Sequence, residues 1–321
     1  MVFNFFKYFC SLCVSQTKIA QAERRTKEFT LFYSEALPIF ALCAKIKKYL
    51  QRIDIRIMNR VKPKKALGQH FLKDMAVSAR IASSLDAYIG MPILEIGPGT
   101  GALTRFLLEK GHDVTVIELD LESVQYLEEH FSELNGRIVA ADFLRLDLTT
   151  LSEKPFCVIG NYPYNISSQI FFKVLDYKDM VPCCSGMLQK EVAERLAAAP
   201  GRKSYGIISV LLQAWYDIEY LFTVEPIAFD PPPKVKSGVI RITRNQRTSL
   251  GCDETLFKQV VKTSFNQRRK TLRNSLKSLL GKACECTNLP IFDKRPEQLS
   301  VEQFEELTRI VEPHILNKPV V

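Results

Sequence analysis

The chain contains 321 residues, of which 46% are hydrophobic and 25% are charged. This composition excludes a disordered chain, a collagen and a small disulfide scaffold, and the length suits about two domains. The formal net charge is +9, and residues 231–284 hold thirteen Lys or Arg against two acidic side chains. Such a local excess favours a polyanionic partner such as nucleic acid.

Cysteine and histidine usage limits the compartment and the cofactors. The nine cysteines show no disulfide framework and so predict a reducing compartment, with the cytoplasm as the expected location. Cys10-x-x-Cys13 and Cys284-x-Cys286 lack a second pair, and the histidines lie far apart in the sequence, so we expect no metal site. We also expect no membrane association, because no run reaches the ~18 apolar residues that a spanning helix needs.

The N-terminal segment differs in composition from the rest of the chain. Residues 1–57 combine an aromatic-rich start with a basic, helix-like end, whereas the sequence becomes regular after Met58. One interpretation is that translation starts at Met58, and a targeting presequence or a functional appendage are the alternatives. We therefore expect an N-terminal extension over 1–57, an α/β domain over 58–244 and a small helical domain over 245–321.

After a helical pattern that begins at Asp74, apolar strands alternate with helices. The predicted strands span 92–96, 113–117, 137–140, 156–160 and 185–188, and helices begin near Thr100, Leu121 and Ser167. This alternation predicts a parallel, doubly wound α/β sheet, in which ligands bind at the carboxyl ends of the strands. Beyond the triple proline 231–233 the pattern predicts a strand over 239–243 and helices over 256–265, 271–280 and 301–311.

Three successive strand ends carry groups that suit a nucleoside ligand. Glu95-Ile-Gly97-Pro-Gly99-Thr-Gly101 follows the first strand and opens a helix, but it lacks the spacing of the dinucleotide fingerprint. Glu118 ends the next strand, where a carboxylate accepts hydrogen bonds from two ribose hydroxyls. Asp142 follows the third strand and can accept a hydrogen bond from the amino group of an adenine.

The fourth strand leads into the most informative segment, Asn161-Tyr162-Pro163-Tyr164. This Asn-x-Pro-aromatic order is typical of methyltransferases that act on an exocyclic amine. The Asn161 side-chain oxygen and the Tyr162 carbonyl would accept the two amine N–H bonds, and Tyr164 would stack on the base. Pro163 fixes the turn.

Six segments together carry a resemblance to a known family. The chain resembles the KsgA/RsmA family of small-subunit ribosomal RNA adenine dimethyltransferases from about Arg60 to Val311. The segments are Lys65–Leu72, Glu95–Gly101, Val116–Asp120, Gly160–Asn165, Phe229–Ser237 and Phe265–Asn274.

The resemblance implies a Rossmann-like, S-adenosylmethionine-dependent methyltransferase sheet with a small helical C-terminal domain and no metal. The enzyme would act as a monomer and dimethylate two adjacent adenosines at N6, in a hairpin loop near the 3′ end of 16S rRNA within the pre-30S particle. Position 70 is His where Asn is commoner, and position 162 is Tyr where Leu is commoner. By position, the cofactor contacts are His70, Leu72, Gly97, Glu118, Asp142 and Asn161; Phe229 is a second aromatic at the target base; and Arg268, Arg269, Lys270 and Arg273 contact RNA phosphates.

Three other functions are alternatives. A resistance-type 23S rRNA adenine methyltransferase shares the glycine loop and Asn-x-Pro-Tyr, but the segments 231–235 and 265–274 favour the small-subunit enzyme. A non-catalytic assembly factor would keep the basic helices without needing Asn161. A mitochondrial transcription-factor-like homologue would use residues 1–57 as a transit peptide, which their acidic residues disfavour.

Overall fold

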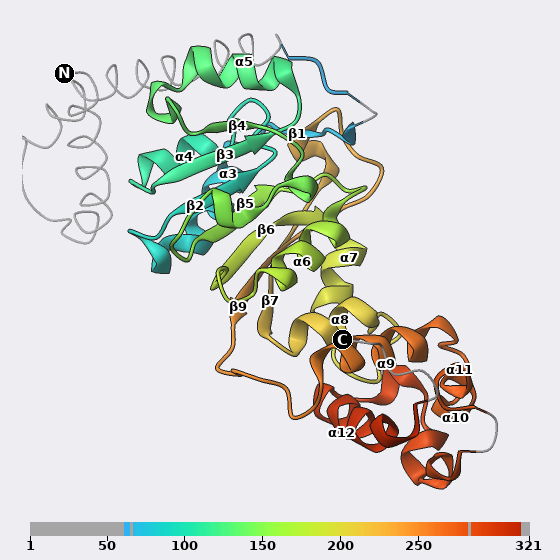
Figure 1. Cartoon of the computed structure of the whole chain (residues 1–321). Coiled ribbons are helices and arrows are strands. Elements are labelled where there is room, and N and C mark those ends of the chain that lie inside the picture. The colour runs from blue at the N-terminus through green and yellow to red at the C-terminus, as the bar shows by residue number, and fades with distance from the viewer. Residues whose placement is uncertain (1–60, 65–66, 282–283, 316–321) are drawn as a thin grey trace, which may run out of the picture. The chain divides into compact units, whose positions relative to one another are not determined.

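The computed structural model describes residues 61–64, 67–281 and 284–315 (Figure 1). The expectations about residues 1–57, Met58 and Cys10-x-x-Cys13 lie outside the described residues, as do Arg60 and Lys65 of the N-terminal motif. Residues 61–321 form one compact unit. The expected division between 244 and 245 therefore stays a prediction.

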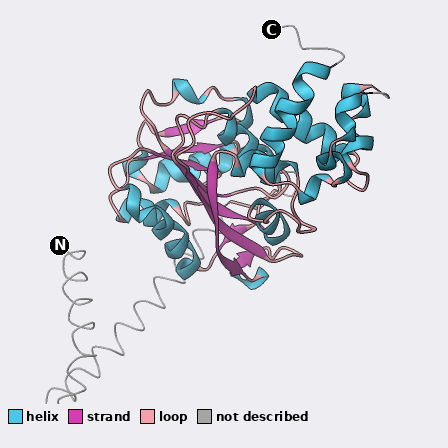
Figure 2. Ribbon diagram, turned by 90° about the horizontal axis from the view of Figure 1, so that it is seen from below, coloured by secondary structure: helices cyan, strands magenta, loops and turns pink. Residues whose placement is uncertain are grey.

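A seven-stranded sheet with the order β4-β3-β2-β5-β6-β9-β7 organises the α/β part. Neighbouring strands from β4 to β6 pair in parallel, so the sequence motifs that follow them lie at one edge of the sheet. Helices lie on both faces of the twisted sheet (Figure 2), which explains why these strands are nearly continuous apolar runs. The parallel strands are β2 (Ile93–Ile96), β3 (Val114–Glu118), β4 (Ile138–Ala140), β5 (Cys157–Asn161) and β6 (Cys183–Gln189).

The helices of this part begin close to the predicted positions. Asp74 caps the first of them by accepting hydrogen bonds from the N–H groups of Ala76 and Val77. α6 buries a face that includes Ile170, Phe171 and Val174. The helices are α3 (Met75–Ala82), α4 (Thr104–Glu109), α5 (Leu121–His130), α6 (Ser167–Asp176), α7 (Lys190–Leu196) and α8 (Ile207–Gln213).

One edge of the sheet differs from the all-parallel prediction. β9 (Ser237–Arg244) lies between β6 and β7 (Tyr216–Val224) and runs antiparallel to both. β7 was not among the predicted strands, because Asp217 and Glu219 interrupt its apolar character. Such residues are tolerated there because an edge strand keeps much of its surface in solvent.

A separate two-stranded sheet joins segments that are distant in the sequence. β1 (Phe71–Leu72) pairs antiparallel with β8 (Phe229–Asp230), so that Leu72 lies opposite Phe229. This pairing attaches the N-terminal motif to the loop that leads into the triple proline.

The C-terminal helices pack on one another and on α8 (Figure 1). The predicted helix over 271–280 is two short helices, because Leu276 has φ −91° and ψ 2° and interrupts the α conformation. Their apolar side chains continue the core of the sheet through Phe257, Phe265 and Phe304. The helices are α9 (Glu254–Asn266), α10 (Leu272–Ser275), α11 (Lys277–Leu280) and α12 (Val301–Val311).

Short 3-10 helices fill many of the connections. None of the helices in the described part of the chain is long and apolar enough to cross a membrane. The 3-10 helices span Ser83–Tyr88, Ser132–Leu134, Phe143–Arg145, Leu148–Thr150, Pro226–Ala228, Glu285–Asn288, Pro290–Asp293, Pro296–Gln298 and Glu312–His314.

Candidate active site

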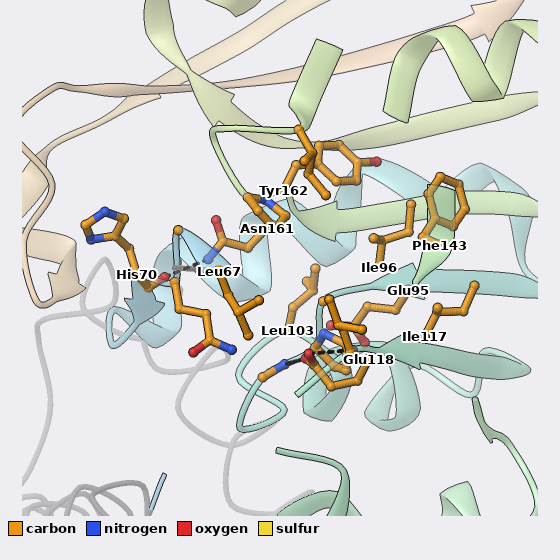
Figure 3. A pocket seen from close by; sticks show the side chains of 18 of the residues that line it. Leu67, His70, Glu95, Ile96, Leu103, Ile117, Glu118, Phe143, Asn161 and Tyr162 are labelled. Atoms are coloured by element: carbon orange, nitrogen blue, oxygen red, sulfur yellow. Dashed lines mark hydrogen bonds between the residues drawn. The ribbon is translucent and has the colours of Figure 1, made fainter. Parts of the chain in front are cut away.

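The carboxyl ends of the four neighbouring strands β4, β3, β2 and β5 surround one pocket (Figure 3). The pocket is open to solvent at its mouth, and both polar and apolar side chains line it, as is typical of a small-molecule site. The structure thus brings together nine of the predicted site residues, namely His70, Leu72, Gly97, Glu118, Asp142, Asn161, Tyr162, Pro163 and Tyr164.

The glycine loop after β2 brings bare backbone to the pocket. Gly97 and Gly99 have φ values of 65° and 55°, in the left-handed region that favours glycine. A Cβ on Gly99 would lie 2.9 Å from a ring carbon of Phe71. The loop therefore has room for its own backbone beneath Phe71 and none for a side chain.

Glu118 lies at the end of β3 and is held in place by backbone donors. Its Oε2 accepts the Gly99 N–H at 3.0 Å, and its Oε1 accepts the N–H groups of Leu119 and Asp120, each at 2.9 Å. Burial raises the pKa of this carboxyl in spite of these hydrogen bonds, which favour the charged form. Three of the roughly four acceptor positions of the carboxylate are thus used, and one position on Oε2 stays available to a ribose hydroxyl.

Asp142 lies at the pocket beyond the end of β4. Its Oδ1 accepts the Leu144 N–H at 2.9 Å and so caps the 3-10 helix Phe143–Arg145. A capping role and a ligand role are compatible, because a carboxylate has about four acceptor positions. Phe143, which follows it, also lines the pocket and offers an apolar surface beside the carboxylate.

Glu95 is a pocket residue that the sequence analysis quoted without assigning it a role. It is 1% exposed, and its Oε2 has no hydrogen-bond partner among the described residues. Burial, with a smaller contribution from the charge of Glu118, raises the pKa of Glu95 to about 8. The available signal was a carboxylate inside the apolar strand 93–96, since a buried polar group needs a partner.

Asn161 ends β5 with its amide already oriented. The Asn161 Nδ2 donates to the main-chain oxygen of His70 at 3.0 Å, which Figure 3 shows as a dashed line. Because this donor bond defines which end of the amide is nitrogen, Oδ1 is the end left to accept hydrogen bonds from a ligand. This is the orientation that the predicted contact with an amine requires.

Tyr162 has its ring in the core of the protein. The ring is 1% exposed, and its hydroxyl donates to the Ser185 carbonyl at 2.6 Å. A Cβ on Gly160 would come within 2.9 Å of this ring, so the glycine makes room for it. Since the ring is committed to the core, it cannot contact a ligand, and the predicted contact through the Tyr162 main-chain carbonyl stays a prediction.

The remaining aromatic residues differ in their placement. The Tyr164 hydroxyl lies 2.6 Å from Ser237 Oγ, and the Tyr164 ring lies beside the His70 imidazole with centroids 5.5 Å apart. The His70 Nδ1 donates to the Pro231 carbonyl at 2.8 Å. Phe229, by contrast, is fully buried in β8 and does not line the pocket, so its predicted contact with a base stays a prediction.

The four predicted RNA-binding cations fall into two groups, those with an acidic partner and those without one among the described residues. Arg273 contacts Asp293 at 2.6 Å, and Arg268 lies 3.8 Å from Glu297. Arg269 and Lys270 are exposed and make no ion pair within the described part of the chain. Lys64, just before the N-terminal motif, is also neutralised, because it pairs with Asp120 and, at 3.1 Å, with Glu122.

The pocket suits S-adenosylmethionine on three structural grounds. The glycine cradle admits a closely approaching ligand, Glu118 can accept from a ribose, and the unpartnered Glu95 oxygen suits a ligand group that carries N–H. An oriented amide acceptor for a second substrate lies in the same pocket. Fold and site together define an S-adenosylmethionine-dependent methyltransferase.

Comparisons with known proteins specify the family. Residues 60–311 match the family model described as ribosomal RNA adenine dimethylase. Over 258 residues the chain is 72% identical to "Ribosomal RNA small subunit methyltransferase A" of Parabacteroides distasonis, an alignment that covers 80% of this chain and 97% of that protein. The chain belongs to the ribosomal RNA adenine dimethylase family, and its cosubstrate is S-adenosylmethionine.

Solved structures show the same fold. A dimethyladenosine transferase from Plasmodium falciparum is 24% identical with a TM-score of 0.65, and the match covers 77% of this chain and 99% of that one. The 23S rRNA methyltransferase ErmE is 26% identical with a TM-score of 0.55, and that match covers 75% of this chain and 99% of its own. The match with the family model starts at residue 60, so residues 1–59 lie outside it.

Proposed function

We propose that this enzyme transfers methyl groups to the N6 amines of two adjacent adenosines in a hairpin loop near the 3′ end of 16S rRNA. It acts as a monomer in the cytoplasm, on the pre-30S particle, and leaves both adenosines dimethylated. The observation that carries the proposal is the Asn161 amide, which the His70 carbonyl orients toward the pocket that also contains the glycine loop. The name of the Parabacteroides relative supports the small subunit as the target.

One side of the pocket would hold the cosubstrate. The backbone of Gly97 approaches it closely. Glu118 accepts a hydrogen bond from its ribose, and Asp142 accepts one from its adenine amino group. Leu72 and the His70 main chain form one wall of the pocket. When bound, S-adenosylmethionine supplies a methyl group that its sulfonium has already activated.

The Asn161–Tyr164 segment would position the acceptor amine. Asn161 Oδ1 and the Tyr162 carbonyl accept its N–H bonds, which favours a pyramidal nitrogen whose lone pair points toward the methyl group. Tyr164 stacks on the flipped base, and Pro163 fixes the turn between the acceptors and the aromatic ring.

These residues act by orientation and need no strong base. The amine proton becomes acidic only once the new C–N bond has formed, so water can accept it. For the second transfer, the monomethylated amine turns and presents its remaining N–H to the same acceptors. Aromatic and main-chain walls allow this rotation better than charged side chains would.

Exposed basic residues would place the RNA. Arg269 and Lys270, beyond the end of α9, are available for phosphate contacts, which position the substrate without reading its sequence. Arg268 and Arg273 keep acidic neighbours and would contribute less.

The test is methyl transfer from labelled S-adenosylmethionine to small subunits that lack the adenine dimethyl marks, with naked rRNA and large subunits alongside. We expect four methyl groups per small subunit, on two neighbouring adenosines, both from the full chain and from a chain that starts at Met58. Label on large-subunit RNA would instead assign the 23S activity. Binding to small subunits without any label would make the protein a non-catalytic assembly factor.

A further inference from the structure

Three potential metal ligands that are distant in the sequence converge near the C-terminal helices. The ligand atoms of Cys284, Cys286 and His314 all lie within 4.8 Å of one another. The two sulfur atoms are 2.7 Å apart, and both cysteines are free thiols. The sequence analysis noted Cys284-x-Cys286 but not His314 as its neighbour, because the histidine follows only after the whole of α12.

Two short 3-10 helices place the three side chains. Cys284 precedes the helix Glu285–Asn288, and Thr287 Oγ1 donates to the Cys284 carbonyl at 2.7 Å, which closes the turn that brings both thiols together. His314 ends the helix Glu312–His314, directly after α12. Cys286 is buried and Cys284 packs against the core, so the backbone fixes the sulfur positions without a bound ion.

We propose that Cys284, Cys286 and His314 form a zinc site, with water as the fourth ligand. Two sulfurs and one imidazole nitrogen are a ligand set that tetrahedral Zn²⁺ prefers. Zn–S bonds of ~2.3 Å would place the two sulfurs about 3.7 Å apart, so the backbone sets where the thiols lie and metal binding requires the side chains to rotate away from each other. The ion takes no part in methyl transfer and instead ties the residue after α12 to the turn that follows α11.

The surroundings favour a metal over a disulfide between the two cysteines. A disulfide between Cys284 and Cys286 would use both sulfurs and leave the His314 imidazole, which lies within 4.8 Å of them, unused. Zinc binding displaces the two thiol protons to solvent, and the charge of the ion itself stabilises the resulting thiolates.

The experiment is a cobalt titration of the reduced, chelator-treated full chain, followed by displacement with zinc. We expect one Co²⁺ per chain, with thiolate-to-cobalt charge transfer in the near ultraviolet and the visible bands of a tetrahedral site. Cys284→Ser and Cys286→Ser abolish the charge transfer, and His314→Gln shifts the visible bands. At a hundredfold excess over its Kd, zinc raises the midpoint of thermal unfolding by roughly 5 °C.

Two variants serve as controls. Cys252→Ser removes a half-buried thiol of the same helical region and leaves the spectrum unchanged. The double variant C10S/C13S removes the Cys10-x-x-Cys13 pair and also leaves the spectrum unchanged. Bands that disappear in C10S/C13S but persist in C284S/C286S would overturn the proposal. The absence of cobalt bands would also overturn it, both if the two thiols react with thiol reagents and if they form a disulfide that a reductant cleaves.

Discussion

Asn161 shows how one hydrogen bond can prepare a side chain for chemistry. Replacing it with Ala removes the oriented acceptor, so we expect single-turnover methyl transfer to fall roughly 10²–10³-fold, the usual cost of losing one preorganised polar contact. Binding to small subunits stays nearly unchanged. The matched control is Asn135→Ala, which changes an exposed asparagine beyond α5. A loss of subunit binding in Asn161→Ala would show that this residue shapes the loop rather than the reaction.

Glu95 makes the stability of the ligand-free enzyme depend on pH. Its pKa in the folded protein is about 8, well above the ordinary value of 4.5. Between these values the unfolded chain loses the proton that the folded protein keeps, so the free energy of unfolding falls as pH rises from about 5 to 8. Glu95→Gln stays neutral, and we expect it to gain a few kcal/mol over the wild type on going from pH 5 to pH 8.

Urea unfolding at both pH values measures this difference. Glu109→Gln, which changes an exposed glutamate at the end of α4, is the control and should follow the wild type. Parallel pH dependences for Glu95→Gln and the wild type would mean that the Glu95 carboxyl is ionised in the folded state.

At the scale of elements, the paired glycines Gly160 on β5 and Gly186 on β6 leave room over the sheet for the Tyr162 ring. A Cβ on Gly160 would lie 2.5 Å from the Ile96 carbonyl, which is backbone and cannot move aside. Gly160→Ala should therefore lower the free energy of unfolding by about 2–4 kcal/mol in urea titrations. Gly206→Ala is the control, because its Cβ would have no neighbour closer than 3.9 Å. Equal stability of the two variants would contradict tight packing around Gly160.

The elements that could be predicted are those with a repeating pattern. The apolar runs 93–96 and 157–161 and the α12 stripe carry such a pattern, and the rule for parallel sheets then placed Gly97, Glu118 and Asn161 at one edge. The two-residue strands β1 and β8 are too short to show a period. β7 was hidden by its acidic residues.

The parts of the site that sequence could not reveal depend on tertiary packing. The orientation of the Asn161 amide comes from a main-chain oxygen 91 positions away. The carboxylate of Glu95 inside an apolar strand was a signal in the sequence, but its place in the pocket and its unpartnered oxygen are known only from the structure. The same holds for Phe229, whose ring lies in the core although its loop lies beside the pocket-lining segment 71–72.

At the scale of the whole molecule, Arg269 and Lys270 are exposed and make no ion pair among the described residues, whereas Arg268 and Arg273 have acidic partners. The double variant R269A/K270A should weaken binding to small subunits and lower the slope of log K against log salt by about 1.5, since two phosphate contacts are lost. Its thermal stability should match the wild type. Lys154→Ala, at an exposed position before β5, is the control and should leave the slope unchanged. A salt-independent loss in R269A/K270A would point to damaged folding instead.

The pairing of β1 with β8 gives the pocket an order of assembly during synthesis. The Pro231 carbonyl that receives the His70 hydrogen bond lies 161 positions further along the chain. The glycine loop and Glu118 leave the ribosome much earlier and can fold onto the growing sheet, whereas Phe71 and Leu72 must wait for Phe229 and Asp230. In a nascent chain the glycine loop and Glu118 therefore reach their places in the pocket before Phe71 and Leu72 do. This rRNA methyltransferase stays incomplete until a ribosome has delivered most of its chain.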